Sequence, residues 1–453
     1  MELLLQAARA ALLVCLSFPC SRPWAQAGER ETNAMRHAKD TTSVSPAASS
    51  ATAALGQLPE EDNEETFRVQ TKGFLDTYHA MRTEQPCDWM ASRTRARGEI
   101  SVERGTASLF ISLNATYNAI LPERTGIQLR EAFITYAQGN FDLRIGRQII
   151  VWGVADALRV ADCVSPCDYT EFLAQDYDDI RMPVNALRAR YTVGSFTFEA
   201  LCNPIVNFFV LPTDGRNPWA LRPPSSPLPY TIDLEEGKPK PKIENVEYGG
   251  RLIANLSGGD ITLSALRTWN KQPALCPSMA NDGQSILING RYLRMTMVAA
   301  DGSLPLGQFV LRAEAALYIG EAQSVLLGHN AQQRNVMNAL VGIDWYPGND
   351  WNISLQYFHK HLFGNMEGIA SYRNAGIATA RISKDLLRST LKLSTFAYVD
   401  VADGALFNRL AIAYSLNDQL ELAAGYDLLY AQRGKLAIYG KNSEAWIKAK
   451  YSF

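Results

Sequence analysis

The sequence predicts an all-β chain that closes into a transmembrane antiparallel β-barrel of roughly 16 to 18 strands. The first indication is periodicity: from Phe67 onward, segments of roughly 10 to 14 residues alternate apolar and polar side chains, as two-faced strands do. The second is that short and long connections take turns along the chain, which is typical of outer-membrane barrels with short periplasmic turns and longer outer loops. The alternative, a soluble β-sandwich or propeller, gives no reason for this alternation.

The composition agrees with a folded chain and excludes two other classes. Of the 453 residues, 47% are hydrophobic and 20% are charged, which is ordinary for a globular protein and not for a disordered one. The formal charge of −2 gives no reason to expect nucleic acid as a partner. Beyond the N-terminal region, no apolar run reaches the length of about 20 residues that a membrane-spanning helix needs.

The N-terminal region predicts export. An apolar stretch over 10–18 follows the basic Arg9, and Ala25-Gln26-Ala27 has the small-x-small pattern of a cleavage site. The next stretch is rich in Ala, Ser, Thr and charge without a period. The predicted organisation is a signal peptide at 1–27, a disordered periplasmic linker at 28–65 and an outer-membrane β-barrel at 66–453. The predicted location is the outer membrane of a Gram-negative bacterium, with its lipids as neighbours.

The connections divide into two groups by length. Tight turns are predicted at 103–106, 138–140, 194–195, 257–260, 346–350, 383–385 and 416–418. Longer connections are predicted at 80–91, 149–184, 208–245, 270–287, 320–334, 362–370 and 431–441. The connection at 400–404 is short where the alternation calls for a long one.

The last segment, EAWIKAKYSF, shows the expected strand pattern in full. One face is apolar and ends in two aromatic residues, and it carries Ala445, Ile447, Ala449, Tyr451 and Phe453. The other face is mostly charged and is predicted to meet water. Aromatic rings at a strand end are typical of the membrane interface. Tyr451 and Phe453 resemble the signal that the outer-membrane assembly machinery reads, so that machinery is a predicted partner.

Charged side chains on the face opposite the apolar stripe are predicted to line the lumen, because a charge facing hydrocarbon is costly. The candidates are Arg93, Arg95, Arg97, Arg144, Arg188, Arg190, Arg312 and Glu314, with Arg251 and Arg267 as further candidates. Two interpretations remain open. A cationic lumen would select anionic or amphiphilic solutes, whereas an internal ladder of ion pairs would fill or stiffen the barrel.

The longest distinctive connection leaves a strand at Gln148 and returns near Val184. We predict that it either caps the outside of the barrel or folds into the lumen as a constriction. Its candidate residues are Trp152, Asp156, Asp162, Asp168, Asp176, Asp178 and Asp179. Opposite charge motivates the hypothesis that this acidic segment faces the arginines across the pore.

Five cysteines remain after the predicted cleavage, and they are Cys87, Cys163, Cys167, Cys202 and Cys276. An odd number leaves at least one without an intramolecular partner. Cys163 and Cys167 are close enough in sequence to form a local disulfide in an oxidising compartment. A metal site at these two cysteines is a more specific alternative to a disulfide, but no histidine or second cysteine pair lies nearby. No cofactor is predicted.

Three blocks of the sequence resemble a known family. They are GRQIIVWGVAD with the following VSPCDYTEF and DYDDIRMPVNALRARY, then LRAEAALY from Leu311, and LVGIDWYPGNDWNISLQYF from Leu340. Together they resemble a family of bacterial outer-membrane barrels of unknown function, over most of residues 67–453. The resemblance implies association with RND-type exporters and periplasmic lipid carriers, and hence traffic of envelope lipids or hydrophobic compounds.

The function favoured by these observations is a porin-like channel or transport component. The alternative is an outer-membrane adhesin or structural anchor with a plugged barrel, which would use the loops at 208–245 and 270–287. An enzyme is not predicted, because the chain has no G-x-S-x-G or H-E-x-x-H motif. His359 and His361 share one strand face and could bind a metal, but two interfacial imidazoles are the simpler interpretation. The oligomeric state stays open.

Overall fold

The computed structural model describes residues 66–174, 179–222 and 228–453. The predicted signal peptide at 1–27, the predicted linker at 28–65, and Asp176 and Asp178 lie outside the described residues. No helix in the described part of the chain is long and apolar enough to cross a bilayer.

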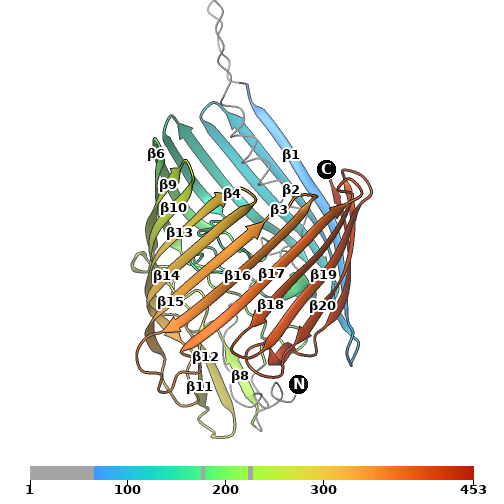
Figure 1. The fold of residues 1–453 in the computed structure, drawn as a ribbon. Helices are drawn as coiled ribbons and strands as arrows, with labels where there is room; N and C mark the ends of the chain where they lie inside the picture. The colour runs from blue at the N-terminus through green and yellow to red at the C-terminus, as the bar shows by residue number, and fades with distance from the viewer. Residues whose placement is uncertain (1–65, 175–178, 223–227) are drawn as a thin grey trace, which may run out of the picture.

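The described chain forms one closed antiparallel barrel of 18 strands (Figure 1), which confirms the predicted fold class at the upper of the two strand counts. The first seven barrel strands are β1 (Arg68–Arg82), β2 (Trp89–Arg104), β3 (Ala107–Asn118), β4 (Gly126–Gln138), β5 (Phe141–Gln148), β6 (Val184–Val193) and β7 (Phe196–Ile205). The next six are β9 (Glu247–Leu256), β10 (Gly259–Trp269), β13 (Arg294–Leu306), β14 (Phe309–Gln323), β15 (Gln332–Trp345) and β16 (Trp351–Leu362). The last five are β17 (Asn374–Leu386), β18 (Leu391–Asp400), β19 (Ala405–Ser415), β20 (Leu420–Tyr430) and β21 (Glu444–Ser452).

The seam between the first and last strands closes the barrel. β1 pairs with β2 on one side and with β21 on the other, from Phe74 opposite Ser452 to Arg82 opposite Glu444. Beyond the last strand, the Phe453 amide donates to the Gly73 carbonyl at 2.9 Å, and the Gly73 amide donates back to Phe453 at 2.8 Å. The seam is therefore paired from Phe74 to Arg82 and extended by the Gly73–Phe453 hydrogen bonds, so the sheet closes without a free edge there.

The two rims of the barrel differ, as the alternation of connections predicts (Figure 1). One rim carries the tight turns, and the other carries the long connections. The 401–404 link between β18 and β19 lies on the second rim although it is short. Residues 383–385 lie inside β17 and do not form a turn. The turn follows at 387–390, where Leu387, Arg388 and Ser389 all have positive φ angles. The sequence pattern did not reveal this turn because no glycine marks it.

Two long connections contain a small second sheet that the sequence did not predict. It consists of β8 (Tyr230–Asp233), β11 (Ala274–Met279) and β12 (Ile286–Arg291), with β12 pairing antiparallel to β11 and parallel to β8. These strands extend from the long-loop rim (Figure 1). Each is short, and β8 pairs with residues distant in sequence, so local periodicity gives little signal for them.

The outer wall is apolar and the inner wall is polar, in the order the strand faces predict. On β14, Leu311 and Ile319 are exposed on the outside, whereas Glu314, Ala316 and Tyr318 are buried inside. On β21, Ile447 and Tyr451 are exposed and Trp446 is buried. One further candidate for the lumen was wrong: Arg267 lies on the outer face with Ile261 and Leu263, close to the long-loop rim. A long arginine side chain can reach the polar interface from such a position.

Candidate functional site: the barrel interior

The connection between β5 and β6 lies inside the barrel. Its residues Ile150, Trp152, Val160, Cys167 and Ile180 are each at most 1% exposed. The segment contacts inward-facing side chains of the wall near its root and on the opposite side of the closed barrel. Of the two predicted arrangements, an outer cap or a constriction, the structure has the segment within the lumen. We call the described residues of this connection, 149–174 and 179–183, the inserted segment.

The arginines of β2 hold one side of the inserted segment. Arg93 donates to Glu171 at 3.0 Å, and Arg95 and Arg97 each donate to Asp179 at 2.7 Å. Arg95 is also paired with Asp76 of β1 at 2.6 Å. The run at 93–97 is therefore neutralised by carboxylates and does not present a bare cationic wall to a solute.

Asp179 is the centre of this contact. A third arginine, Arg130 of β4, approaches it at 3.5 Å and also donates to its backbone carbonyl. Burial raises the pKa of the Asp179 carboxyl, but the charges of Arg95, Arg97 and Arg130 outweigh burial and hold the pKa well below its usual range. The carboxylate is thus ionised at every physiological pH.

The far side of the inserted segment is tied to β14 and β17. Asp156 lies 3.8 Å from Arg312 and 3.6 Å from Arg381. Arg312 also pairs with Asp344 of β15 at 2.7 Å. Because β17 stands across the barrel from the root of the segment, these contacts mean that the segment crosses the lumen.

Glu314 of β14 holds the segment through its backbone. The carboxylate accepts hydrogen bonds from the amides of Val154 at 3.0 Å, Ala155 at 2.9 Å and Ala161 at 2.5 Å. Gly153 makes this approach possible: its φ is +88°, and a Cβ there would lie 2.2 Å from the Glu314 Oε1. Glu314, predicted as a lumen-lining charge, therefore serves as an anchor for the inserted segment.

The tryptophan before this glycine is also fixed by the wall. The Trp152 indole donates to Glu199 of β7 at 3.1 Å, and the Arg251 guanidinium lies 5.2 Å from the ring centroid. Trp152 is 1% exposed. Trp152 and Gly153, which end the GRQIIVWG stretch, therefore fix the point at which the segment enters the lumen.

Two of the predicted constriction aspartates have other partners. Asp162 pairs with Arg181 and lies 3.8 Å from Arg159, so its contacts lie within the inserted segment and not across an open pore. Asp168 pairs with Arg124 in the β3–β4 connection. Both carboxylates stabilise the shape of the segment or its attachment to a neighbouring loop. Opposite charge alone could not distinguish these partners from the wall arginines.

Aromatic residues from three connections pack together beside the inserted segment. Phe172 lies 4.9 Å from Trp219 and 5.8 Å from Tyr439 between ring centroids. Tyr439 also donates to the Trp219 carbonyl at 3.1 Å. The sequence analysis missed this cluster because its members come from loops far apart in the chain. It joins the β5–β6, β7–β9 and β20–β21 connections into one packed unit.

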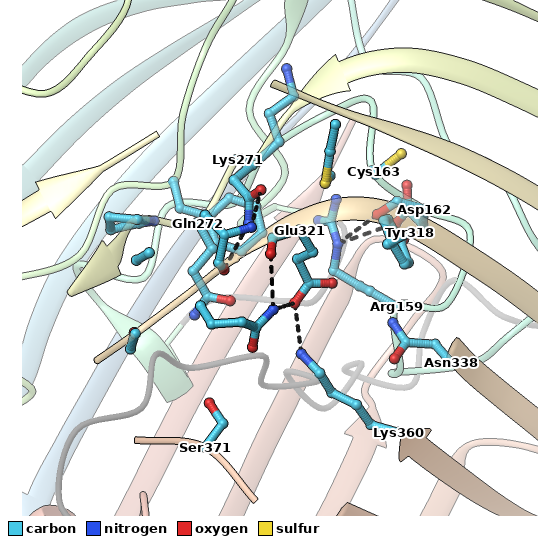
Figure 2. Close-up of a pocket in the computed structure, with 18 of the residues that line it drawn as sticks. Arg159, Asp162, Cys163, Lys271, Gln272, Tyr318, Glu321, Asn338, Lys360 and Ser371 are labelled. Atoms are coloured by element: carbon cyan, nitrogen blue, oxygen red, sulfur yellow. Dashed lines mark hydrogen bonds and ion pairs between the residues drawn. The ribbon is translucent and has the colours of Figure 1, made fainter. Parts of the chain in front are cut away.

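A small cavity of about 140 Å³ remains on the side of the long connections (Figure 2). It is lined by Arg159 and Cys163 of the inserted segment, Lys271 of the β10–β13 connection, and wall residues that include Glu321 and Lys360. Lys271 pairs with Glu247 and Lys360 pairs with Glu321, so the charges of these two lysines are compensated. Burial raises the pKa of the Cys163 thiol to about 12, so the thiol stays protonated.

Three predicted lumen arginines lie on β5 and β6, next to the Glu199 carboxylate that Trp152 contacts. Arg144 stands directly opposite Arg188 in the strand register, and Arg190 follows two residues further on the same face. Arg190 pairs with Glu199 at 2.7 Å, and Arg144 donates to the Thr135 hydroxyl at 3.2 Å. No hydrogen-bond acceptor among the described residues contacts the Arg188 Nε, and the residue is 8% exposed.

The cysteine and histidine hypotheses can be compared with the structure. All five described cysteines are free, so the expected bridge between Cys163 and Cys167 is absent, and the Cys167 sulfur instead accepts from Arg159 at 2.6 Å. His359 and His361 lie near the end of β16 at the long-loop rim, where they contact Tyr357 and Asn374 respectively. No group of three metal-binding side chains occurs among the described residues.

The fold and interior define a large outer-membrane-type β-barrel with an inserted segment. Within that class, residues 48–200 match a family model described as "Protein of unknown function (DUF1302)", which confirms the resemblance to a family of unknown function over that stretch. The blocks at 311–318 and 340–358 lie outside the matched residues. No curated protein matches the sequence.

Several solved structures share the fold at low sequence identity. Pseudomonas aeruginosa OccK8 (OprE) has a TM-score of 0.53 and 8% identity, covering 85% of this chain and 98% of that one. Pseudomonas aeruginosa OccK5 (OpdH) has a TM-score of 0.50 and 10% identity, again covering 85% and 98%. The outer membrane channel DcaP of Acinetobacter baumannii has a TM-score of 0.45 and 12% identity, covering 86% and 99%. At such identities, the likeness to the two Pseudomonas structures shows the fold alone.

Proposed function

We propose that this chain is an outer-membrane channel whose lumen is closed at rest by the inserted segment, and that a solute passes when the segment moves. One observation carries the proposal: the segment crosses the lumen and is tied to β2 on one side and to β14 and β17 on the other. A barrel of this size can hold an aqueous channel, and an element inside it controls passage.

The chemistry of the ties supports a movable element. The wall contacts of the segment at Asp156, Glu171 and Asp179 are ion pairs and charge-assisted hydrogen bonds. Such pairs gain little net stability over separated, solvated charges, because desolvation offsets much of the attraction. Water and a charged solute entering the lumen can replace the wall arginines as partners of these carboxylates. Apolar contacts offer no comparable replacement by water or a charged solute.

The outer surface supports a membrane location. Exposed apolar side chains such as Ile127, Ile134, Val341, Leu355 and Ile447 lie around the barrel wall. An apolar band on the outside of a closed barrel fits the hydrocarbon core of a bilayer. We therefore place the barrel in the outer membrane of a Gram-negative bacterium, surrounded by its lipids. Partnership with an RND-type exporter and a periplasmic lipid carrier is a further proposal that rests on the family resemblance.

An anchor or adhesin with a permanently plugged barrel is the second candidate. The small sheet of β8, β11 and β12 favours it, because that sheet gives the long-loop rim an ordered surface that could contact a partner. The two candidates differ in one measurable property, which is conduction through the lumen after the ties are weakened.

The test is single-channel conductance of the purified, refolded protein in a planar bilayer. We expect brief openings for the wild type and more frequent or larger openings for Asp179→Asn and Asp156→Asn, because each substitution removes a counter-ion that holds the segment. Asp214→Asn is the matched control, since the Asp214 carboxylate pairs with Arg216 in an exposed loop, away from the described contacts of the inserted segment. Silence in all four proteins would favour the anchor. A large steady conductance in the wild type would show that the segment does not close the lumen.

The proposed assembly signal has its own test. Phe453 and Tyr451 lie at the tight-turn rim, with ring centroids 6.2 Å apart. Deleting Phe453 should lower the amount of folded barrel recovered from the outer membrane, measured by the heat-dependent mobility shift of folded barrels. Equal recovery of the deletion variant and the wild type would argue against recognition of this residue by the assembly machinery.

A further inference from the structure

The eight lumen candidates are not equivalent, because most of their charges are already compensated. Arg93, Arg95, Arg97 and Arg312 each pair with at least one carboxylate, and Glu314 accepts three backbone amides. The exceptions are two arginines, Arg144 on β5 and Arg188 on β6. Arg144 and Arg188 face each other across the strand pair, and neither forms an ion pair with a described carboxylate. Like charges placed directly opposite each other in a sheet are unfavourable without a shared counter-ion.

The nearby carboxylates Asp142 and Glu199 form no direct ion pair with Arg144 or Arg188. Glu199 is occupied, since Arg190 and Arg251 both donate to it, at 2.7 Å and 3.0 Å. Asp142 is the register partner of Arg190, yet it forms no ion pair with any of the three arginines, and its Oδ1 has no hydrogen-bond partner. The group therefore keeps an excess of positive charge at a place where Arg188 is only 8% exposed.

The arginines around Arg188 are held in place. The Arg144 Nε donates to the Thr135 hydroxyl, and its guanidinium lies 4.3 Å from the Phe133 ring centroid. Arg190 is fixed by Glu199 and keeps a side chain that is 34% exposed, so the group is open to the lumen. A set of fixed guanidinium groups has the planar donor arrangement that suits an oxyanion, and fixing it in advance lowers the cost of binding.

We propose that Arg144, Arg188 and Arg190 form a binding site for a small oxyanion, the carboxylate or phosphate group of a transported solute. The site lies in the half of the barrel nearer the tight turns, beside the Glu199 carboxylate that Trp152 of the inserted segment contacts. This inference rests on the proposed channel function for its role in transport, but binding of the anion does not require conduction.

The test measures anion binding by the purified full-length protein in detergent at constant ionic strength. Sodium acetate and inorganic phosphate are titrated separately against chloride while the melting temperature is recorded. We expect a saturable rise of the melting temperature for the wild type, because an anion that binds only the folded state stabilises it. Arg188→Gln should raise the half-saturating concentration by about tenfold or more, since it removes a charged donor. Arg144→Gln should raise the half-saturating concentration by a similar factor. This variant provides the test if Arg188→Gln does not fold.

The matched control is Arg267→Gln, which removes an arginine from the outer face of β10 and leaves the lumen unchanged. It should titrate like the wild type. A response to acetate alone identifies a carboxylate site, and a response to phosphate alone identifies a phosphate site. The inference is overturned by a wild type without a saturable response to either anion, or by equal responses of Arg188→Gln and the wild type. Saturable binding with a silent channel would reject the proposed function and retain the site.

Discussion

The arginines of β2 and those of β6 share one sequence pattern and have different surroundings. Both runs place arginines at every second residue on the inner face. Arg95 and Arg97 meet Asp179 of the inserted segment, whereas Arg188 stands opposite Arg144 across the strand pair. The difference shows that the carboxylates of the inserted segment, together with wall carboxylates such as Asp76 and Glu199, decide which luminal charges remain available to a solute.

The largest effect is expected at the shared counter-ion. Asp179→Asn leaves Arg95, Arg97 and Arg130 without the carboxylate they share, and removing one partner of a buried ion pair costs about 3–5 kcal/mol. Urea unfolding of the variant should show a loss of this size in the free energy of unfolding. The exposed-loop variant Asp214→Asn should stay within about 0.5 kcal/mol of the wild type. A comparable loss in both would mean that Asp179 has no special role.

The next effect compares the two arginine runs directly. Arg95→Gln should destabilise the folded barrel by about 3 kcal/mol, because it leaves Asp76 without its charged donor. Arg188→Gln, measured in chloride, should be neutral or stabilising, because it removes a repulsion and breaks no ion pair. The two unfolding curves in the same detergent give the comparison. Equal destabilisation by both variants would show that Arg188 has a partner of equal strength.

A backbone substitution tests how the segment enters the lumen. Gly153→Ala places a Cβ against the Glu314 carboxylate and forces a positive φ on alanine. Strain of this kind costs about 1–3 kcal/mol. We expect the inserted segment to become more accessible to limited proteolysis in the variant. Gly98→Ala is the control, since a Cβ at Gly98 would meet nothing within 4 Å. Protease resistance equal to that of the wild type would contradict the contact.

The smallest effect concerns pH. The pKa of Asp179 is held well below its ordinary value of 3.8, so its ion pairs contribute fully above the pKa of the unfolded chain and are lost as pH falls through the folded pKa. The stability difference between the wild type and Asp179→Asn should therefore stay constant from neutral pH down to about pH 4 and shrink only below it. A difference that shrinks between about pH 7 and pH 5 would contradict this ionisation state.

Much of the barrel was predictable because strand faces follow a local rule. The alternation along β14 and β21 correctly separated the lipid face from the lumen, and the lengths of the connections gave the two rims. Partners across the lumen follow no local rule. Asp162 and Asp179 look alike in sequence, yet one pairs within the inserted segment and the other pairs with β2.

Other residues of the interior had no sequence signal at all. Arg130 and Arg381 each stand alone on their strands, and each finds its carboxylate only through the folded segment. The aromatic cluster of Phe172, Trp219 and Tyr439 and the sheet of β8, β11 and β12 arise where distant connections meet. Such contacts depend on the closed barrel bringing those connections together.

The contact between Glu314 and the inserted segment has a consequence for how such chains diverge. The carboxylate recognises the amides of Val154, Ala155 and Ala161, which any residue except proline supplies. This contact therefore places no demand on the three side chains themselves, although Ala161 is fully buried, whereas Glu314 and Gly153 are constrained by it. Two chains could then keep the same closure of the lumen with little sequence in common along the segment that forms it.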